Sequence, residues 1–280
     1  MAETPEMRKR PLLLQLLLVV VMLGWAEAAW AYRLKDNVSV GGGLRADIYM
    51  PDRRRLGARR PVVVYVHGGG WIKGDRKKVY SQPEWLTDRG YVFVSVQYRP
   101  VPTTTIDGQV RDVATALKWV RRNIRRYGGN GRKVVAMGHS AGAHLVSLVA
   151  ARNAGGKLAG IIANDVQAYD VVAYNVLRGS LGHPYDKAFG NDPNNWVRWS
   201  PATYARQNRR MPPHLIMHSG SQRERRRQLA WGYANLLKGR GTRVEVFDGG
   251  AYTHGSIAKS LGKPNTATKA VERFLRRVAG

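Results

Sequence analysis

The 280-residue sequence contains no cysteine. Disulfide bonds, thiolate nucleophiles and cysteine-ligated metal sites are therefore excluded. Acidic residues are also scarce, because 19 Asp and Glu stand against 46 Lys and Arg, for a formal net charge of +27. Such an excess attracts anionic surfaces in general. The arginine runs of this sequence are scattered, and no zinc-finger or RNP-like signature accompanies them. We therefore expect a solvated basic surface with non-specific attraction to anions and no dedicated nucleic-acid partner.

The first 31 residues have the layout of a secretory signal peptide. Arg8, Lys9 and Arg10 precede an apolar stretch over 12–23, and two A-x-A cleavage patterns end at residues 28 and 31. A membrane span usually needs about 20 apolar residues, and this stretch is shorter, so an uncleaved anchor is the less favoured alternative. The sequence thus predicts a secreted or periplasmic protein with one mature domain over 32–280.

Short, β-branched apolar runs recur along the mature chain, as is typical of strands buried on both faces. Amphipathic helical patterns separate these runs. This alternation predicts an α/β fold with a doubly wound, mostly parallel sheet covered on both sides. The predicted strands are 36–50 (one or two strands), 61–66, 91–98, 134–137, 158–162, 214–217 and 242–247, and the predicted helices are 84–89, 106–127, 141–152, 223–238 and 267–278.

Residues 166–212 interrupt the alternation. They contain six tyrosines and tryptophans among loop signals such as Asn191-Asp192-Pro193. We interpret them as an aromatic-rich insertion over one end of the sheet. No repeat or linker marks a second domain.

Ser140 lies in the stretch GHSAG (138–142), which matches G-x-S-x-G between a predicted strand and a predicted helix. Glycines allow the sharp turn that exposes a serine hydroxyl at the carboxyl edge of a sheet, and the following helix N-terminus favours negative charge. A simpler interpretation is a βα turn whose serine only caps the helix. The pattern indicates a candidate nucleophile.

The stretch HGGGW (67–71) directly follows the strand predicted over 61–66. Three successive glycines let backbone N–H groups turn toward one point. Together with the amide of Ala141, the amides of Gly69 and Gly70 are therefore the predicted oxyanion hole.

His254 is the predicted general base, because it follows the last predicted strand and precedes the final helix. Five competing histidines have weaker positions, since they flank the two motifs or bracket a buried strand: His67, His139, His144, His214 and His218. His214 and His218 lack carboxylate neighbours in sequence, so they do not indicate a metal site.

HGGGW, GHSAGAHL and the late GGAYTHG together resemble the α/β-hydrolase superfamily, specifically its HGGG(W)-type carboxylesterases of the hormone-sensitive-lipase and kynurenine-formamidase type. The resemblance covers nearly everything after residue 60. It implies that Ser140 is the nucleophile and His254 the general base. Such enzymes usually carry an Asp soon after the strand that ends here at His218, and this sequence has none there.

The acid that would orient His254 therefore has three candidates. Glu224 is the first choice, although Ser221-x-x-Glu224 also fits a capping box at a helix start. Asp165 is the second, because it follows the strand predicted over 158–162. Asp248 is the third, and another residue or a working Ser–His dyad stays open.

The sequence thus predicts a secreted serine carboxylesterase that acts on a small-molecule ester and needs no metal or other cofactor. Trp71 and Tyr252 are expected to shape its pocket. An arylformamidase or other amidase would use the same machinery. A non-catalytic binding protein on a hydrolase scaffold is the alternative from a different class.

Overall fold

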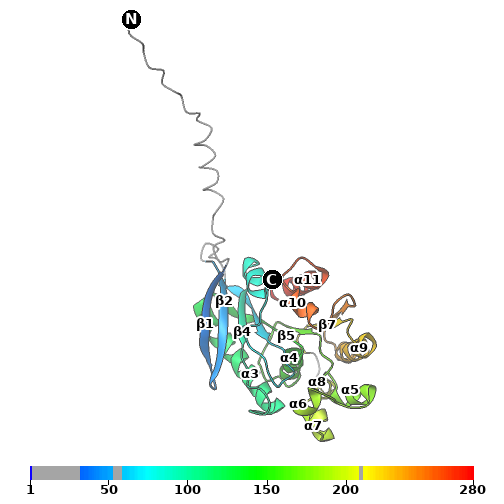
Figure 1. Ribbon diagram of the computed structural model, residues 1–280. Helices are drawn as coiled ribbons and strands as arrows, with labels where there is room; N and C mark the ends of the chain where they lie inside the picture. The colour runs from blue at the N-terminus through cyan, green and yellow to red at the C-terminus, as the bar shows by residue number, and fades with distance from the viewer. Residues whose placement is uncertain (2–31, 53–58, 208–210) are drawn as a thin grey trace. The chain divides into compact units, whose positions relative to one another are not determined.

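The core of the structure is an eight-stranded sheet in the order β1-β2-β4-β3-β5-β6-β7-β8 (Figure 1). Only β1 and β2 run against their neighbours, and every pairing from β4 to β8 is parallel. This confirms the predicted α/β, mostly parallel sheet. The strands are β1 (Tyr32–Gly41), β2 (Leu44–Pro51), β3 (Arg60–Val66), β4 (Val92–Val96), β5 (Gly129–His139), β6 (Gly160–Asn164), β7 (His214–Ser219) and β8 (Val244–Gly249).

This computed structural model describes Met1 and residues 32–52, 59–207 and 211–280. The predicted signal peptide lies outside the described residues apart from Met1, so it stays a prediction. In the part of the chain that the structure describes, no helix is long and apolar enough to cross a membrane.

Helices cover both faces of the sheet. Successive strand residues point to opposite sides, so an apolar strand presents buried side chains to both faces. In β3, Val62, Val64 and Val66 belong to one core cluster, while Val63 and Tyr65 belong to the other. The first cluster contains α3 (Ile106–Asn123), α4 (Ala141–Ala151) and α9 (Arg223–Gly239), and the second contains α2 (Gln82–Asp88), α10 (Ser256–Lys259) and α11 (Thr266–Ala279).

The predicted insertion lies between β6 and β7, but it is more helical than its composition suggested. Asp192, which was interpreted as a loop signal, caps a helix and accepts the amide N–H of Asn194, with Pro193 as the first helical residue. Asp170 caps another in the same way. The four short helices lie together in yellow-green in Figure 1: α5 (Val171–Arg178), α6 (Tyr185–Phe189), α7 (Pro193–Arg198) and α8 (Pro201–Ala205).

Several element boundaries differ from the predictions by two residues or more, and two of them have a clear physical reason. The helix expected over 106–127 ends at Asn123 and continues as a 3-10 turn, Ile124–Tyr127, closed by Gly128 in the left-handed conformation. β5 begins at Gly129, five residues before the predicted strand, because its polar first half still pairs with the start of β3. Neither difference moves the carboxyl edge of the sheet, where the candidate site lies.

Candidate active site

Ser140 occupies the sharp turn between β5 and α4. Its backbone has φ 55° and ψ −124°, which a non-glycine residue rarely adopts and which is typical of a strained functional turn. The glycines on either side are required by close packing. A Cβ on Gly138 would collide with the backbone of Gly142, and a Cβ on Gly142 would collide with the carbonyl of Val66.

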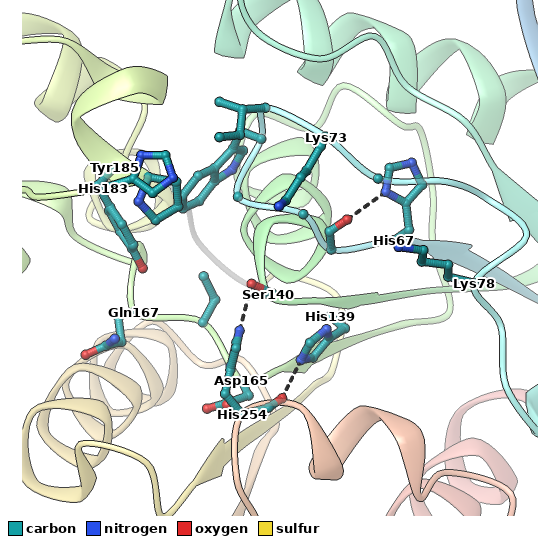
Figure 2. A pocket seen from close by; sticks show the side chains of 18 of the residues that line it. His67, Lys73, Lys78, His139, Ser140, Asp165, Gln167, His183, Tyr185 and His254 are labelled. Carbon is teal, nitrogen blue, oxygen red and sulfur yellow. Dashed lines mark hydrogen bonds and ion pairs between the residues drawn. The ribbon is translucent and has the colours of Figure 1, made fainter.

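Ser140, His254 and Asp165 form a continuous hydrogen-bonded chain (Figure 2). The Nδ1 of His254 donates to Asp165 Oδ2 at 2.6 Å. Since the proton is on Nδ1, the Nε2 atom is the acceptor for the Ser140 hydroxyl, and the two atoms lie 3.0 Å apart. This geometry can withdraw a proton from Ser140 as its oxygen attacks.

Asp165 is fully buried. Its other oxygen, Oδ1, accepts the backbone N–H of Ser219 at 2.9 Å and Nη1 of Arg226 at 3.1 Å. Burial by itself raises the pKa of this carboxyl, but the hydrogen bond from His254, the charge of Arg226 and the Ser219 amide outweigh it and lower the pKa to about 2. Asp165 is therefore a carboxylate at any pH near neutrality.

Two further contacts fix the loop that carries His254. Its backbone N–H donates to Ser221 Oγ at 2.9 Å, and its carbonyl accepts Nε2 of His139 at 2.9 Å. Burial lowers the pKa of His139 to about 4, so this ring is neutral near pH 7. The sequence reasoning gave His139 no role of its own. Its position beside Ser140 did not reveal that it would reach a loop 115 residues away.

The structure corrects the choice of Glu224 as the acid. Glu224 is exposed on the first turn of α9, whereas the carboxylate beside His254 belongs to Asp165, the second candidate. The proposed capping box is also absent at the start of α9, because Gln222 is its cap residue and Ser221 is bonded to His254. Asp248, the third candidate, accepts the amide of Gly250 in its own loop.

Residues 67–71 pass beside Ser140, as the motif predicted. Gly69 and Gly70 have φ of 135° and 60°, a region that favours glycine. A Cβ on Gly69 would collide with the carbonyl of Lys73, and one on Gly70 would lie 2.6 Å from Pro184. Among the described residues, no backbone carbonyl accepts the amide N–H of Gly69, Gly70 or Ala141.

Trp71 is buried beneath this loop and anchors it. Its indole Nε1 donates to His144 Nδ1 at 3.1 Å, and His144 Nε2 donates to the carbonyl of Trp199 at 2.7 Å. Burial lowers the pKa of His144 to about 4, which keeps the ring neutral. Trp71 also packs edge-on against Tyr185 and Phe189. It therefore ties the glycine loop to α4 and to the insertion.

A cavity of about 790 Å³ opens above Ser140 and is lined by the glycine loop, Trp71 and insertion residues such as Tyr174 and Tyr185. The insertion therefore contributes aromatic side chains to the cavity wall, as expected. Tyr252 is not part of this described lining. Its ring packs beside Phe247 and its hydroxyl reaches Asn265 and Thr266, on the side of the sheet covered by α11, so its assignment to the pocket was wrong.

The sequence matches the family described as BD-FAE over residues 46–224. The chain belongs to the BD-FAE family. The matched region includes the glycine loop, Ser140 and Asp165, while His254 follows it. Membership confirms the resemblance to α/β-hydrolases that the motifs implied.

Several curated proteins are similar to parts of this BD-FAE chain. Esterase LipQ of Mycobacterium tuberculosis is 40% identical over 105 residues, which are 37% of this chain and 25% of LipQ. Isoprenylcysteine alpha-carbonyl methylesterase ICME of Arabidopsis thaliana is 31% identical over 46% of this chain and 31% of its own length. The non-reducing polyketide synthase ausA of Emericella nidulans is 38% identical over 44% of this chain and 5% of the synthase. The chain therefore spans less than a third of the length of these relatives.

Two solved esterases show the same fold as the BD-FAE chain. Est2 of Thermogutta terrifontis, with propionate bound, superposes with a TM-score of 0.70 and 22% identity over 89% of this chain and 94% of its own. Esterase B of Lactobacillus rhamnosis, inhibited by a tributyrin phosphonate, gives a TM-score of 0.71 and 19% identity over 95% and 96%.

Proposed function

We propose that the protein is a serine carboxylesterase in which Ser140 is the nucleophile, His254 the general base and Asp165 the orienting acid. The hydrogen-bonded chain from Ser140 through His254 to Asp165 is the observation that carries this proposal. The esterase names of LipQ and ICME, and the fold shared with Est2 and esterase B, support ester hydrolysis as the reaction.

In the proposed reaction, Ser140 Oγ attacks the ester carbonyl while His254 Nε2 takes the hydroxyl proton. The imidazolium that forms is stabilised by the buried Asp165 carboxylate and returns the proton to the alcohol as it leaves. Water, deprotonated by the same Nε2, then attacks the acyl-enzyme and releases the carboxylic acid. Bonds, protons and charge balance without any other reactant.

The amides of Gly69, Gly70 and Ala141 are the proposed donors to the negatively charged oxygen of the tetrahedral intermediate. Two observations support this role. Their N–H groups are not used by backbone acceptors in the described chain, and Ala141 is the first residue of α4, where the helix dipole favours negative charge. Preorganised donors of this kind typically contribute a factor on the order of 10² to 10³ in rate each.

The test is hydrolysis of 4-nitrophenyl butyrate by residues 32–280, with Ser140→Ala as the matched variant. We expect turnover by the wild type, loss on the order of 10⁶-fold in kcat in the variant, and a covalent phosphonate adduct on Ser140 by mass spectrometry. A 4-nitroformanilide assay separates an esterase from an amidase. A wild type that is as inactive as Ser140→Ala on both substrates, and that forms no adduct, overturns the proposal in favour of a binding protein.

Export through residues 1–31 is a second part of the proposal and is independent of the chemistry. It is supported by the basic start, apolar core and A-x-A patterns of the sequence. N-terminal sequencing of the full chain expressed in a bacterial host with an export pathway tests it, with cleavage after residue 28 or 31 expected.

A further inference from the structure

The cavity above Ser140 is lined by more positive than negative side chains. Its basic residues are Lys73, Lys78, Arg178 and Arg226, and its acidic residues are Asp75 and Asp165. An ordinary ester is neutral and needs none of these charges for recognition. The imbalance therefore raises the question of what the cations bind.

Asp165 cannot neutralise the cavity, because it is already bonded to both His254 and Arg226. Asp75 is exposed, and its Oδ1 accepts the backbone N–H of Lys77 at 2.8 Å. Among the described residues, neither Lys73 nor Lys78 makes an ion pair with a carboxylate. Within the described ranges, the hydrogen bonds of Arg178 go to the carbonyl and hydroxyl of Ser180, at 3.1 and 3.2 Å.

These three cations, which stand against the single remaining carboxylate of Asp75, reach the cavity from two segments. Lys73 and Lys78 follow the glycine loop, and Figure 2 shows Lys73 between His67 on one side and His183 and Tyr185 on the other. Arg178 ends α5 and lies against Gly182, next to the pocket residue His183. Cations thus approach one cavity from the glycine loop and from the insertion.

Of the three cations, Arg178 acts electrostatically on Tyr174 in the cavity wall. Burial raises the pKa of Tyr174, and the charges of Arg178, Arg225 and Arg226 oppose that rise. Like charges that converge on a concave surface focus the potential and concentrate an anionic ligand there.

We propose that the substrate is an anionic ester, in which a carboxylate or phosphate separate from the scissile bond is held by Lys73, Lys78 and Arg178. This inference rests on the proposed esterase function and names the substrate class for it. Guanidinium and ammonium groups share the ability to bind both oxyanions. The anion is an unreacting handle, and its binding holds the ester carbonyl over Ser140.

The expected preference is moderate, because the three side chains are exposed. A solvent-exposed ion pair contributes about 1.5- to 5-fold in affinity, so three of them predict a preference of about tenfold in kcat/KM for an anionic ester over a neutral one of the same size. Salt screens such pairs, and the preference should shrink when NaCl is raised from 0.05 to 0.5 M.

The experiment compares esters of matched shape. On the alcohol side, the probes are 3-carboxyphenyl and 3-phosphonophenyl butyrate against the neutral 3-carbamoylphenyl butyrate. On the acyl side, the mono-4-nitrophenyl ester of suberic acid is compared with that of suberic monoamide. The larger anionic-to-neutral ratio identifies the side of the ester that carries the anion. The two aryl probes separate a carboxylate from a phosphonate, which stands for a phosphate.

The variant Lys73→Gln/Lys78→Gln/Arg178→Gln should reduce the anionic-to-neutral ratio to about 1. The control Arg111→Gln/Lys118→Gln/Lys269→Gln removes the same three charges from exposed positions on α3 and α11 outside the cavity lining, and should keep the ratio. Wild-type ratios near 1 on both sides, with the neutral esters still hydrolysed, overturn this inference and leave the esterase proposal intact. Loss of all hydrolysis and of the Ser140 adduct overturns both.

Discussion

The carboxylate of Asp165 reaches from the end of β6 to the backbone amide of Ser219 at the end of β7, at 2.9 Å. Because β6 and β7 are parallel neighbours, their carboxyl ends meet at one edge of the sheet. A side chain from either strand can therefore reach the same point beside His254. This explains how a carboxylate can lie beside His254 although no Asp directly follows β7.

Replacing Asp165 by Asn should lower kcat on 4-nitrophenyl butyrate by on the order of 10³- to 10⁴-fold, because an amide no longer fixes the Nδ1–H tautomer of His254. The control is Glu224→Gln, which removes a carboxylate from an exposed position and should leave kcat within about twofold. Equal losses in the two variants would show that Asp165 does not have this role.

Gly142→Ala should prevent the tight packing of the nucleophile turn, because the added Cβ would collide with the carbonyls of Val66 and His67. We expect destabilisation of several kcal/mol or failure to fold. Gly232→Ala is the matched substitution, since it lies exposed within α9 with no heavy atom near the new Cβ. Alanine there should raise stability by about 0.5–1 kcal/mol in urea unfolding. Equal effects of the two changes would contradict the steric argument.

The two glycine motifs and the strand–helix alternation could be predicted from sequence because each depends on local chemistry. Glycines are needed wherever backbones approach closely, and β-branched runs are needed wherever a strand is buried on both faces. The fold could therefore be predicted from the sequence, and so could the positions of Ser140, His254 and the glycine loop at the carboxyl edge of the sheet. The paired carboxylate depends on which strands are neighbours, and that order is a property of the whole sheet.

The assignments of Glu224 and Tyr252 relied on proximity along the chain. Glu224 follows β7 as the resemblance required, but it is exposed on the first turn of α9, and the carboxylate bonded to His254 is that of Asp165. Tyr252 is close to His254 in sequence, yet its ring packs beside Phe247 and its hydroxyl reaches Asn265 and Thr266. Proximity in sequence does not fix the side of a loop on which a side chain lies.

Trp71→Phe should weaken both stability and catalysis. The smaller ring can keep the contacts with Tyr185 and Phe189 but leaves His144 Nδ1 without its donor. An unsatisfied buried acceptor costs about 1–3 kcal/mol, which corresponds to a fall in Tm of roughly 2–10 °C for a domain of this size. Because Trp71 holds the glycine loop, kcat should fall more than KM changes. Combining Trp71→Phe with His144→Phe removes the unsatisfied Nδ1 acceptor, although the carbonyl of Trp199 then loses its donor, and should recover part of the lost stability. No recovery would show that the lost packing and the unpaired Trp199 carbonyl outweigh the hydrogen bond to Nδ1.

Acid should begin to destabilise the fold at pH values well above the pKa of its carboxylates. The reason is that burial lowers the pKa of His139, His144 and His214 to about 4, from an ordinary value of 6.5. Between these two pH values the unfolded chain binds protons that the native state does not bind. The free energy of unfolding is therefore highest above about pH 6.5 and decreases as the pH falls toward 4. Lowering of the Asp165 pKa to about 2 adds a further loss only below its ordinary value of 3.8.

His214 isolates this effect, because it is fully buried and its Nδ1–H donates to the carbonyl of Pro212 at 2.7 Å, away from Ser140 and His254. Its share of the pH-dependent stability is on the order of 3 kcal/mol. His214→Asn keeps a donor near Nδ1 but cannot titrate. Urea unfolding at pH 7.0, 6.0, 5.0 and 4.5 should therefore give a shallower pH dependence for this variant, even if its stability at pH 7 is lower. Parallel curves for the two proteins would show that His214 gains its proton in the native state as readily as in the unfolded chain, and the acid sensitivity would then have to come from other groups.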